Sequence, residues 1–420
     1  MTRKFIVNVV TGQGGGGHYA TYHALRAIAA QQNLPWEFQV TDMDEIITGL
    51  SASGEVKNAY EMFGFSGHDL YNLMVKGGWT WLWPLKMRLN KLLVRLNYNV
   101  GVKKFTAHWQ QQQPDLVVSV MPLYNKGLWE SLQQAKPKTP YVTVLTDFAD
   151  CPPDFWFDTD AVNTLVCGTQ RAVDQARSLG ISEDRIVQSS GLVVHPTFYE
   201  KRALSKKQTN EQKSLERQRL GLLPAVPTGL VTFGGNGSDT MLTIADKLAA
   251  LGRDIQLIFM CGRNQALADE LNNYQGTQKR LVVGFTDHMA SYMSLSDFMI
   301  GKPGNVSISE AVVMKLPIIT QCSATTMSQE RYCAEWVMQK EIGLVVRSFK
   351  GIDQAVGRLL SPGMLAQYQR NLEGIHNQAG FEVIDLLNRL LTMSGLDKAD
   401  AQGKADTQTA AAISMEEVRP

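Results

Sequence analysis

A histidine that follows a run of glycines is the first residue in this sequence whose type and position suggest chemistry. The apolar run Lys4–Val10 leads into Gly14–Gly17, and His18 comes next, before the helical pattern Tyr19–Gln31. A strand, a glycine loop and a helix in this order bring the loop to the carboxyl edge of a sheet, where ligands bind. Imidazole titrates near neutral pH, so we predict that His18 is a general base. The alternative, that His18 only steadies the loop, stays open.

Asp147 is a second candidate because it stands at the carboxyl end of another strand. Tyr141–Leu145 is an apolar run that predicts a buried strand, and Thr146 and Asp147 follow it. Asp147 would accept the proton itself or orient His18, and the sequence leaves both roles open.

The stretch Val282–Glu335 has the features expected of a nucleotide-sugar site. The apolar strand Phe298–Ile300 runs into the turn Gly301–Gly304, which opens a helix. Ser307 lies in the first turn of that helix, and Glu310 lies one turn later. Helical spacing therefore puts both side chains near the helix N-terminus, where backbone N–H groups favour anions.

Two further features accompany this helix. The apolar strand Pro317–Thr320 leads into a predicted loop that carries Gln329 and Glu330. Upstream, the strand Gly229–Phe233 runs into a second glycine loop and a helix, which repeats the architecture of the first domain. The loop consists of Gly234, Gly235, Asn236, Gly237 and Ser238.

The order of these motifs resembles the monogalactosyldiacylglycerol synthase-like glycosyltransferases, which form glycosyltransferase family 28 of the GT-B superfamily. The likeness rests on the motifs GGGH, CGRN, GF-x3-M, KPG, SxxEA, LPII and QE, and it covers the chain to about Met393. It implies an α/β fold of the GT-B type, in which two Rossmann-like, doubly wound domains face each other across a cleft. One departure concerns the acceptor side: Pro152 stands where the family commonly has histidine.

The resemblance also assigns roles in donor binding. It implies that the Gly-Phe turn at Phe285 meets uracil, that Glu310 holds the ribose hydroxyls and that Gln329 and Glu330 hold the sugar. It places acceptor handling at a loop of Gly15, Gly16 and Gly17. The donor-binding residues expected in this way are Gly234, Gly235, Asn236, Gly237, Ser238, Arg263, Phe285, Thr286, Met289, Pro303, Gly304, Ser307, Glu310, Gln329 and Glu330.

No metal and no cofactor are predicted, and a UDP-sugar serves as co-substrate. Two D-x-D triplets, at 42–44 and 158–160, match the pattern with which GT-A enzymes hold a divalent ion, but 40 acidic residues readily supply both by chance. In a GT-B framework, backbone amides of loop 234–238 and a helix N-terminus stabilise the leaving diphosphate instead.

A dinucleotide-binding site is the alternative from a different class. Gly12, Gly14 and Gly17 fit the spacing G-x-G-x-x-G, and Asp42 ends the next strand, where such a site has its ribose-binding acid. The chain would then be an NAD-binding oxidoreductase. Four successive glycines before His18 exceed what that fingerprint requires, which favours the transferase.

Length and composition set the outer limits. We expect an N-terminal acceptor domain at 1–200, a linker at 201–227, a donor domain at 228–394 and a disordered tail at 395–420. With 41 basic and 40 acidic residues, the net charge of +1 predicts no nucleic-acid partner. Five cysteines without a CxxC pair favour a reducing compartment, and no apolar run reaches the length of a membrane span.

One segment of the first domain combines interfacial aromatic residues with cations. Trp79, Trp81 and Trp83 precede the basic helical pattern Lys86–Arg95, and such a pattern suits contact with an anionic bilayer. The same segment would equally suit an ordinary core, because its leucines at 89, 92, 93 and 96 have helical spacing. We therefore expect a cytoplasmic protein with peripheral membrane association, with this segment as one candidate for the contact.

The family resemblance implies an inverting glycosyltransferase that moves a hexosyl group from a UDP-sugar to a lipid acceptor such as diacylglycerol. Galactose or glucose is the closest analogy for the sugar. A transferase that adds N-acetylglucosamine to a lipid-linked sugar is the second possibility within the same fold.

Overall fold

The computed structural model describes residues 4–12, 16–46, 83–207, 210–324 and 326–394. Gly15, Trp79, Trp81 and the predicted tail at 395–420 lie outside the described residues. Trp83 begins a helix, but its side chain is not among those described. The predictions for these residues are therefore untouched by the structure.

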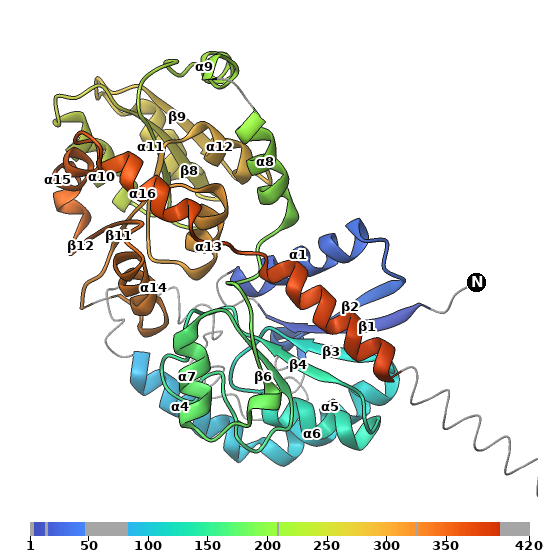
Figure 1. Ribbon diagram of the computed structural model, residues 1–420. Helices are drawn as coiled ribbons and strands as arrows, with labels where there is room; N and C mark the ends of the chain where they lie inside the picture. Colours follow the sequence, from blue (N-terminus) through green and yellow to red (C-terminus); the bar gives the residue numbers. More distant parts are fainter. Residues whose placement is uncertain (1–3, 13–15, 47–82, 208–209, 325, 395–420) are drawn as a thin grey trace, which may run out of the picture.

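The first lobe is built on six parallel strands, and its central strands Leu116–Ser119 and Tyr141–Val144 are apolar runs buried on both faces, as is typical of parallel sheets. Their order in the sheet is β2-β1-β3-β4-β5-β6. The direction in which successive strands are added across the sheet therefore reverses between β1 and β3, which is the topological switch point. Helices cover both faces (Figure 1). The strands are β1 (Phe5–Thr11), β2 (Trp36–Asp42), β3 (Leu116–Ser119), β4 (Tyr141–Val144), β5 (Thr164–Cys167) and β6 (Ile186–Gln188), and the labelled helices are α1 (Gly17–Gln31), α4 (Trp83–Leu96), α5 (Tyr98–Gln112), α6 (Asn125–Ala135) and α7 (Gln170–Ser178).

The second lobe repeats this plan with the strand order β12-β11-β10-β7-β8-β9. Its topological switch point lies between β7 and β10. All of its paired strands are parallel. The strands are β7 (Thr228–Thr232), β8 (Gln256–Gly262), β9 (Arg280–Gly284), β10 (Phe298–Gly301), β11 (Ile318–Gln321) and β12 (Gly343–Val346), and the helices are α10 (Thr240–Ala249), α11 (Gln265–Asn273), α12 (Met289–Leu295), α13 (Asn305–Met314), α14 (Ser328–Gln339), α15 (Ile352–Leu359) and α16 (Met364–Glu373). The predicted fold class, two doubly wound α/β domains, is confirmed.

One local prediction was wrong. Gln329 and Glu330 were placed in a loop, but they lie in the first turn of α14. The structure also contains two short edge strands for which the sequence analysis made no prediction: β12 pairs with β11, and β6 pairs with β5.

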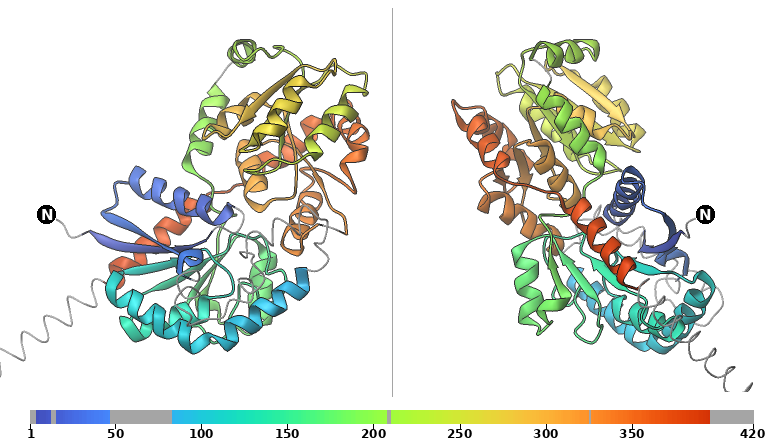
Figure 2. Two further views of the ribbon diagram at one scale, coloured as in Figure 1. Left: turned by 180° about the vertical axis from the view of Figure 1, so that it is seen from behind. Right: turned by 45° about the vertical axis from the view of Figure 1, so that its right-hand side comes forward.

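The chain crosses between the lobes twice. Helix α8 (Pro196–Lys207) leads from the first lobe toward the second, and a helix at 379–394 returns (Figures 1 and 2). In this returning helix, Val383, Ile384 and Leu387 pack in one buried cluster with Val7 and Leu25 of the first lobe. The segment 228–394, predicted as one donor domain, therefore ends in a helix that packs on the N-terminal sheet.

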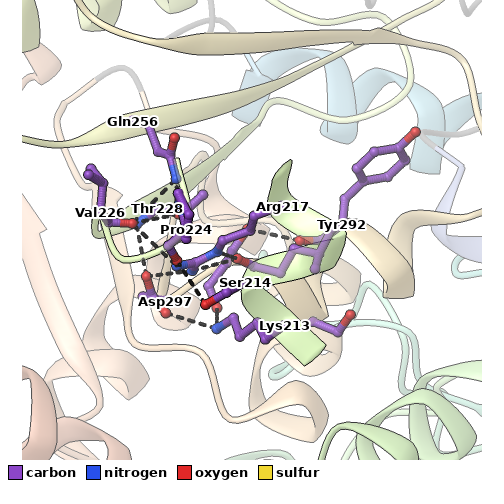
Figure 3. A network of polar contacts seen from close by, with 12 residues as sticks. Lys213, Ser214, Arg217, Pro224, Val226, Thr228, Gln256, Tyr292 and Asp297 are labelled. Carbon is purple, nitrogen blue, oxygen red and sulfur yellow. Dashed lines mark hydrogen bonds and ion pairs between the residues drawn. The ribbon is translucent and has the colours of Figure 1, made fainter. Parts of the chain in front are cut away.

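The predicted linker is anchored to the second lobe by a buried arginine. Arg217 of α9 (Asn210–Arg219) is 5% exposed. Its guanidinium donates to the Leu295 carbonyl at 2.7 and 2.9 Å, to the Pro224 carbonyl at 3.1 Å and to the Asp297 carboxylate at 2.8 Å (Figure 3). The backbone N–H of Thr228, the first residue of β7, donates to the same carboxylate at 2.8 Å. The linker is thus docked against the sheet end that lies opposite the candidate site.

Candidate active site

His18 lies at the topological switch point of the first sheet, between β1 and β3, which is the ligand-binding position in doubly wound folds. It is the second residue of α1, directly after the glycine loop that follows β1. Its Nδ1 lies 2.5 Å from the carbonyl oxygen of Val120, just beyond β3, and 3.3 Å from Oγ1 of Thr146. A carbonyl oxygen only accepts, so Nδ1 carries the hydrogen and Nε2 of the neutral ring is left as an acceptor.

This environment also sets the charge of the ring. Burial lowers the pKa of His18 to about 4, although the Val120 carbonyl and the charge of Asp44 act in the opposite direction. His18 is therefore neutral at physiological pH, with the tautomer that a general base at Nε2 requires.

Asp147 lies near His18 in the fold but is not paired with it. Its Oδ2 accepts from Nε1 of Trp156 at 2.8 Å, and its Oδ1 accepts from Nδ2 of Asn305 at 2.6 Å. Burial raises the pKa of Asp147 to about 7. The predicted role of orienting His18 is not realised in this structure, since Val120 and Thr146 hold that ring and no hydrogen bond joins the two described side chains.

The second glycine loop lies at the topological switch point of the second sheet, between β7 and β10. Gly234 and Gly237 have φ values of 80° and 60°, which side chains with a Cβ rarely adopt. A Cβ at Gly262 would lie 2.2 Å from the carbonyl oxygen of Gly235, and the N–H of Arg263 donates to that oxygen at 2.8 Å. These contacts hold the loop with Asn236 exposed and Ser238 half-buried at the carboxyl edge of the sheet.

Ser307 and Glu310 lie on α13, the helix that begins at this edge, as predicted. Burial alone raises the pKa of Glu310 to about 8. Among the described residues, no side chain or backbone group hydrogen-bonds to its half-buried carboxyl group. Glu310 thus has unused hydrogen-bonding capacity in a position where burial makes an unsatisfied charge costly, which is the state expected of a ligand-binding carboxylate.

Phe285 and Arg263 form an exposed pair at the outer side of the same edge. The guanidinium carbon of Arg263 lies 4.3 Å from the centre of the Phe285 ring, and Phe285 is 58% exposed. Thr286 accepts from the N–H of His288 at 3.1 Å, and Met289 begins α12. A large aromatic side chain exposed beside a cation offers a planar surface for a base.

Lys302 is a functional candidate that the sequence analysis missed. Its Nζ donates to the Glu330 carboxylate at 2.8 Å, and a Cβ at Gly234 would lie 3.9 Å from its Cε. The turn therefore brings a cation to the second glycine loop, next to the buried Pro303 and to Gly304. The signal was present in the sequence, because Lys302 lies inside the Gly-Lys-Pro-Gly turn. Gln329, beside Glu330, is half-buried, and Ser328 donates to its side-chain oxygen at 3.3 Å.

The first glycine loop meets the start of α13 at the junction of the lobes. A Cβ at Gly17 would lie 3.3 Å from the Val306 side chain of α13. Gly16, with φ 82°, caps α1 directly before it. The helix that carries His18 and the helix that carries Glu310 are therefore in contact near their N-terminal ends.

Asp42, the acid of the alternative dinucleotide site, and Asp160 of the second D-x-D triplet both have partners within the protein. Asp42 is 8% exposed, accepts from the Tyr19 hydroxyl and accepts from the N–H of Asp44 at 2.8 Å. It is therefore occupied in capping rather than open to a ribose. In the second D-x-D triplet, Asp160 pairs with Lys126 at 2.6 Å.

The overall fold places the chain in a known structural class. It superposes on the crystal structure of MurG from Acinetobacter baumannii with a TM-score of 0.56 at 12% identity, covering 92% of this chain and 100% of the other. It superposes on a UDP-GlcNAc 2-epimerase from Neisseria meningitidis, determined with UDP-GlcNAc bound, with a TM-score of 0.55 at 14% identity, covering 92% and 100%. The chain thus has the GT-B fold, a framework that is not confined to transferases.

Sequence comparison places the chain within this class. Residues 52–194 match the family model of monogalactosyldiacylglycerol synthase, and residues 230–348 match the C-terminal domain of glycosyltransferase family 28. The chain is therefore related to the monogalactosyldiacylglycerol synthases of this glycosyltransferase family, as its motifs predicted.

Curated relatives agree with this assignment. Monogalactosyldiacylglycerol synthase of Spinacia oleracea is 27% identical over 92% of this chain and 72% of its own length. Probable monogalactosyldiacylglycerol synthase 3 of Oryza sativa subsp. japonica is 28% identical over 70% of this chain, which spans 58% of the rice protein.

Proposed function

We propose that this protein is an inverting glycosyltransferase that moves a hexosyl group from a UDP-sugar to the hydroxyl group of a lipid such as diacylglycerol. One observation carries the proposal: a helix with a neutral, base-competent His18 meets a helix with an unsatisfied Glu310, in a chain that matches both family models. Catalysis and donor binding would then be brought together at the junction of the two lobes.

In this proposal the second lobe binds the donor. Glu310 accepts hydrogen bonds from the ribose hydroxyls, and the exposed turn at Phe285 lies against the uracil. The leaving diphosphate is stabilised by backbone amides of the 234–238 loop and by the Lys302 ammonium group. The Lys302 side chain lies beside this loop at Gly234. Gln329 and Glu330 bind the sugar. No metal ion takes part, because these groups supply the positive charge.

The first lobe binds the acceptor and performs the proton transfer. Nε2 of His18 removes the proton from the lipid hydroxyl as that oxygen attacks the anomeric carbon, and the bond to UDP breaks on the opposite side. Displacement from the opposite side inverts the configuration. The glycine loop leaves space for the acceptor beside the base at Gly16, where an added Cβ would meet nothing within 4 Å.

Diacylglycerol is the acceptor that the relatives favour, because the curated proteins described above are named for a galactosylated diacylglycerol. Galactose or glucose is the corresponding sugar. Transfer of N-acetylglucosamine to a lipid-linked sugar is the second candidate and uses the same donor site. Contact with a membrane follows from either acceptor, since two-chain lipids do not leave the bilayer readily.

One exposed face of the first lobe fits such a contact. Leu89, Leu92 and Leu96 of α4 are 43, 51 and 72% exposed, and their spacing puts them on one side of the helix. The interpretation of these leucines as core residues is therefore wrong for three of the four, and Leu93 is half-buried. Arg95 is exposed on the same helix. None of the described helices is long and apolar enough to cross a membrane.

The donor assignment is tested by calorimetric titration of the purified protein with UDP and with NAD. We expect UDP to bind and NAD not to bind. Hydrogen bonds from the ribose hydroxyls stabilise the ionised form of Glu310, whose pKa burial raises to about 8 in the free protein. Glu310→Ala therefore removes a charged acceptor from the complex and should weaken UDP binding by about 1.5–3 kcal/mol, the range for hydrogen bonds to charged groups. Glu341→Ala, which changes an exposed acid in the turn after α14, is the matched control and should bind UDP like the parent. Unchanged UDP affinity in Glu310→Ala, or NAD binding tighter than UDP binding, would contradict the assignment.

A further inference from the structure

A single asparagine ties the two lobes together beside the candidate site. Asn305 is the first residue of α13 in the second lobe, and it is 9% exposed. Its Nδ2 donates to Oδ1 of Asp147 at 2.6 Å, and its Oδ1 accepts from the backbone N–H of Phe148 at 3.1 Å. Both partners follow β4 of the first lobe. The Asn305 amide of the second lobe therefore binds both the Asp147 side chain and the Phe148 backbone of the first lobe.

The neighbouring groups leave this amide only one orientation. The thiol of Cys333 on α14 donates to Oδ1 of Asn305 at 2.7 Å, so that oxygen accepts from two sides. On the other side, Asp147 is fixed by Nε1 of Trp156 at 2.8 Å. Each hydrogen bond in the series Trp156–Asp147–Asn305–Cys333 joins a donor to an acceptor. A buried network in which every group is satisfied specifies one geometry strongly.

Packing around the network joins α14 to Phe148 and to α7 of the first lobe. The Phe148 ring meets Trp336 of α14 edge to face, with centroids 5.0 Å apart. Arg171 lies over the Tyr332 ring at 4.6 Å and 3.8 Å from the Glu335 carboxylate. The contact between the lobes is thus centred on the start of α13 and on one face of α14.

The geometry points to Asn305 as a positioning residue for the proposed transfer: with Asp147 it forms a clasp that fixes the donor helix α13 relative to His18. The inference rests on the proposed function for its chemistry. Glu310 is five residues beyond Asn305 on α13, which is about 7.5 Å along the axis. A shift of the clasp therefore moves the donor relative to the base. Asp147 acts in the clasp and is not the base.

An exchange of the two side chains tests the clasp directly. Asn305→Asp sets a carboxylate against Asp147, and Asp147→Asn sets an amide against Asn305, so each single change breaks the pairing. The double variant restores it, because an asparagine at 147 can accept from Trp156 and donate to an aspartate at 305. That aspartate still accepts from Phe148 and Cys333. We expect each single variant to lose about 10²-fold in kcat, the cost of a small misplacement, with UDP affinity changed far less. The double variant should recover to within about tenfold of the parent.

This design separates the clasp from catalysis by Asp147. A base role for Asp147 requires the carboxylate at position 147, so the double variant would then stay as inactive as Asp147→Asn, and the inference would be overturned. Asn163→Asp is the matched control, since Asn163 is buried within the first lobe and donates to Thr143 at 2.7 Å. It should leave turnover near the parent value.

Amide hydrogen exchange gives a readout that does not depend on activity. Exchange at Phe148 should be faster in both single variants and return to the parent rate in the double variant, while Asn163→Asp leaves it unchanged. If Asn305→Asp does not fold, Asn305→Ala replaces it in this measurement, and parent-like exchange there would contradict the clasp. If the parent transfers no sugar, the proposed function fails, and exchange at Phe148 still decides on the clasp.

Discussion

His18 is the residue on which the proposed chemistry depends most. If Nε2 is the base, His18→Ala should lower kcat by about 10²–10⁴-fold while UDP still binds. His23→Ala, an exposed histidine further along α1, is the control and should have nearly parental turnover. Steady-state kinetics and UDP titration of both variants give the measurement. A loss of only a few-fold in His18→Ala would assign the proton transfer to water or to another group.

The environment of His18 also predicts a pH dependence. Burial lowers its pKa from 6.5 to about 4. The unfolded chain therefore binds a proton between these two values that the folded chain does not bind, so the contribution of His18 makes the protein less stable as the pH falls from about 6.5 to about 4. The acid limb of kcat/KM that belongs to His18 should likewise lie near pH 4, well below the ordinary histidine value.

At the residue scale, the sequence predicted what depends on local order. His18 after its glycines, Ser307 and Glu310 one turn apart, and the second glycine loop all lie where strand, loop and helix succession put them. It could not predict Asn305 or the partners of Asp147. The hydrogen bond between Asn305 and Asp147 joins positions 158 residues apart, and no spacing rule in one sequence relates residues of two different lobes.

At the scale of elements, helix α4 is the candidate for contact with a bilayer. Replacing Leu89, Leu92 and Leu96 with glutamine should reduce co-sedimentation with anionic vesicles by at least about tenfold in partition coefficient, because each buried leucine contributes about 1.5–3 kcal/mol. Added salt should weaken binding of the parent, since its cations near the surface are screened within about 10 Å at 0.1 M ionic strength. Three exposed side chains are changed, so folding should be preserved.

The control for this experiment is equally apolar. Leu204, Leu215 and Leu223 are 61, 49 and 47% exposed on other parts of the molecule, and their replacement with glutamine should leave vesicle binding unchanged. Replacing Trp79, Trp81 and Trp83 with serine provides a second arm for the same segment. Equal vesicle binding by the folded leucine and tryptophan variants would mean that the contact lies elsewhere.

The linker arginine makes a prediction about stability. Arg217→Ala leaves Asp297 without its buried cation and removes the donors to the Leu295 carbonyl (Figure 3). Breaking a buried pair in this way should lower the free energy of unfolding by about 3–5 kcal/mol, measured by urea denaturation. Arg219→Ala, an exposed arginine of the same helix, should change it by no more than about 0.5 kcal/mol. Equal stability of the two variants would contradict the structural role of Arg217.

Elements were predicted well where apolar runs are long and bounded by glycine or proline. Strand β7 was expected at 229–233 and is found at Thr228–Thr232, and β10 was expected at 298–300 and is found at Phe298–Gly301. Strand β6 has three residues and lies at a sheet edge, where it is only partly buried. Such a strand is stabilised by its neighbour rather than by its own sequence, so periodicity does not reveal it.

For the whole molecule, the junction of the lobes is both core and site. One buried cluster contains Phe148 and Leu192 of the first lobe together with Met293, Ile308 and Tyr332 of the second. The helix at 379–394 adds a second link by packing on the first sheet. These contacts hold α1 and α13 at fixed positions, which is what a transfer between a donor on one lobe and an acceptor on the other requires.

Sugar transfer itself tests the central claim most directly. Purified protein is incubated with vesicles that contain diacylglycerol and with UDP-galactose, UDP-glucose or UDP-N-acetylglucosamine, and the lipids are analysed by mass spectrometry and proton NMR. The account predicts a glycolipid from UDP-galactose or UDP-glucose, with a β-linkage formed from the α-linked donor, and no product from His18→Ala on the same timescale. A product with retained α-configuration, or no glycolipid from any of these donors although UDP binds, would contradict it.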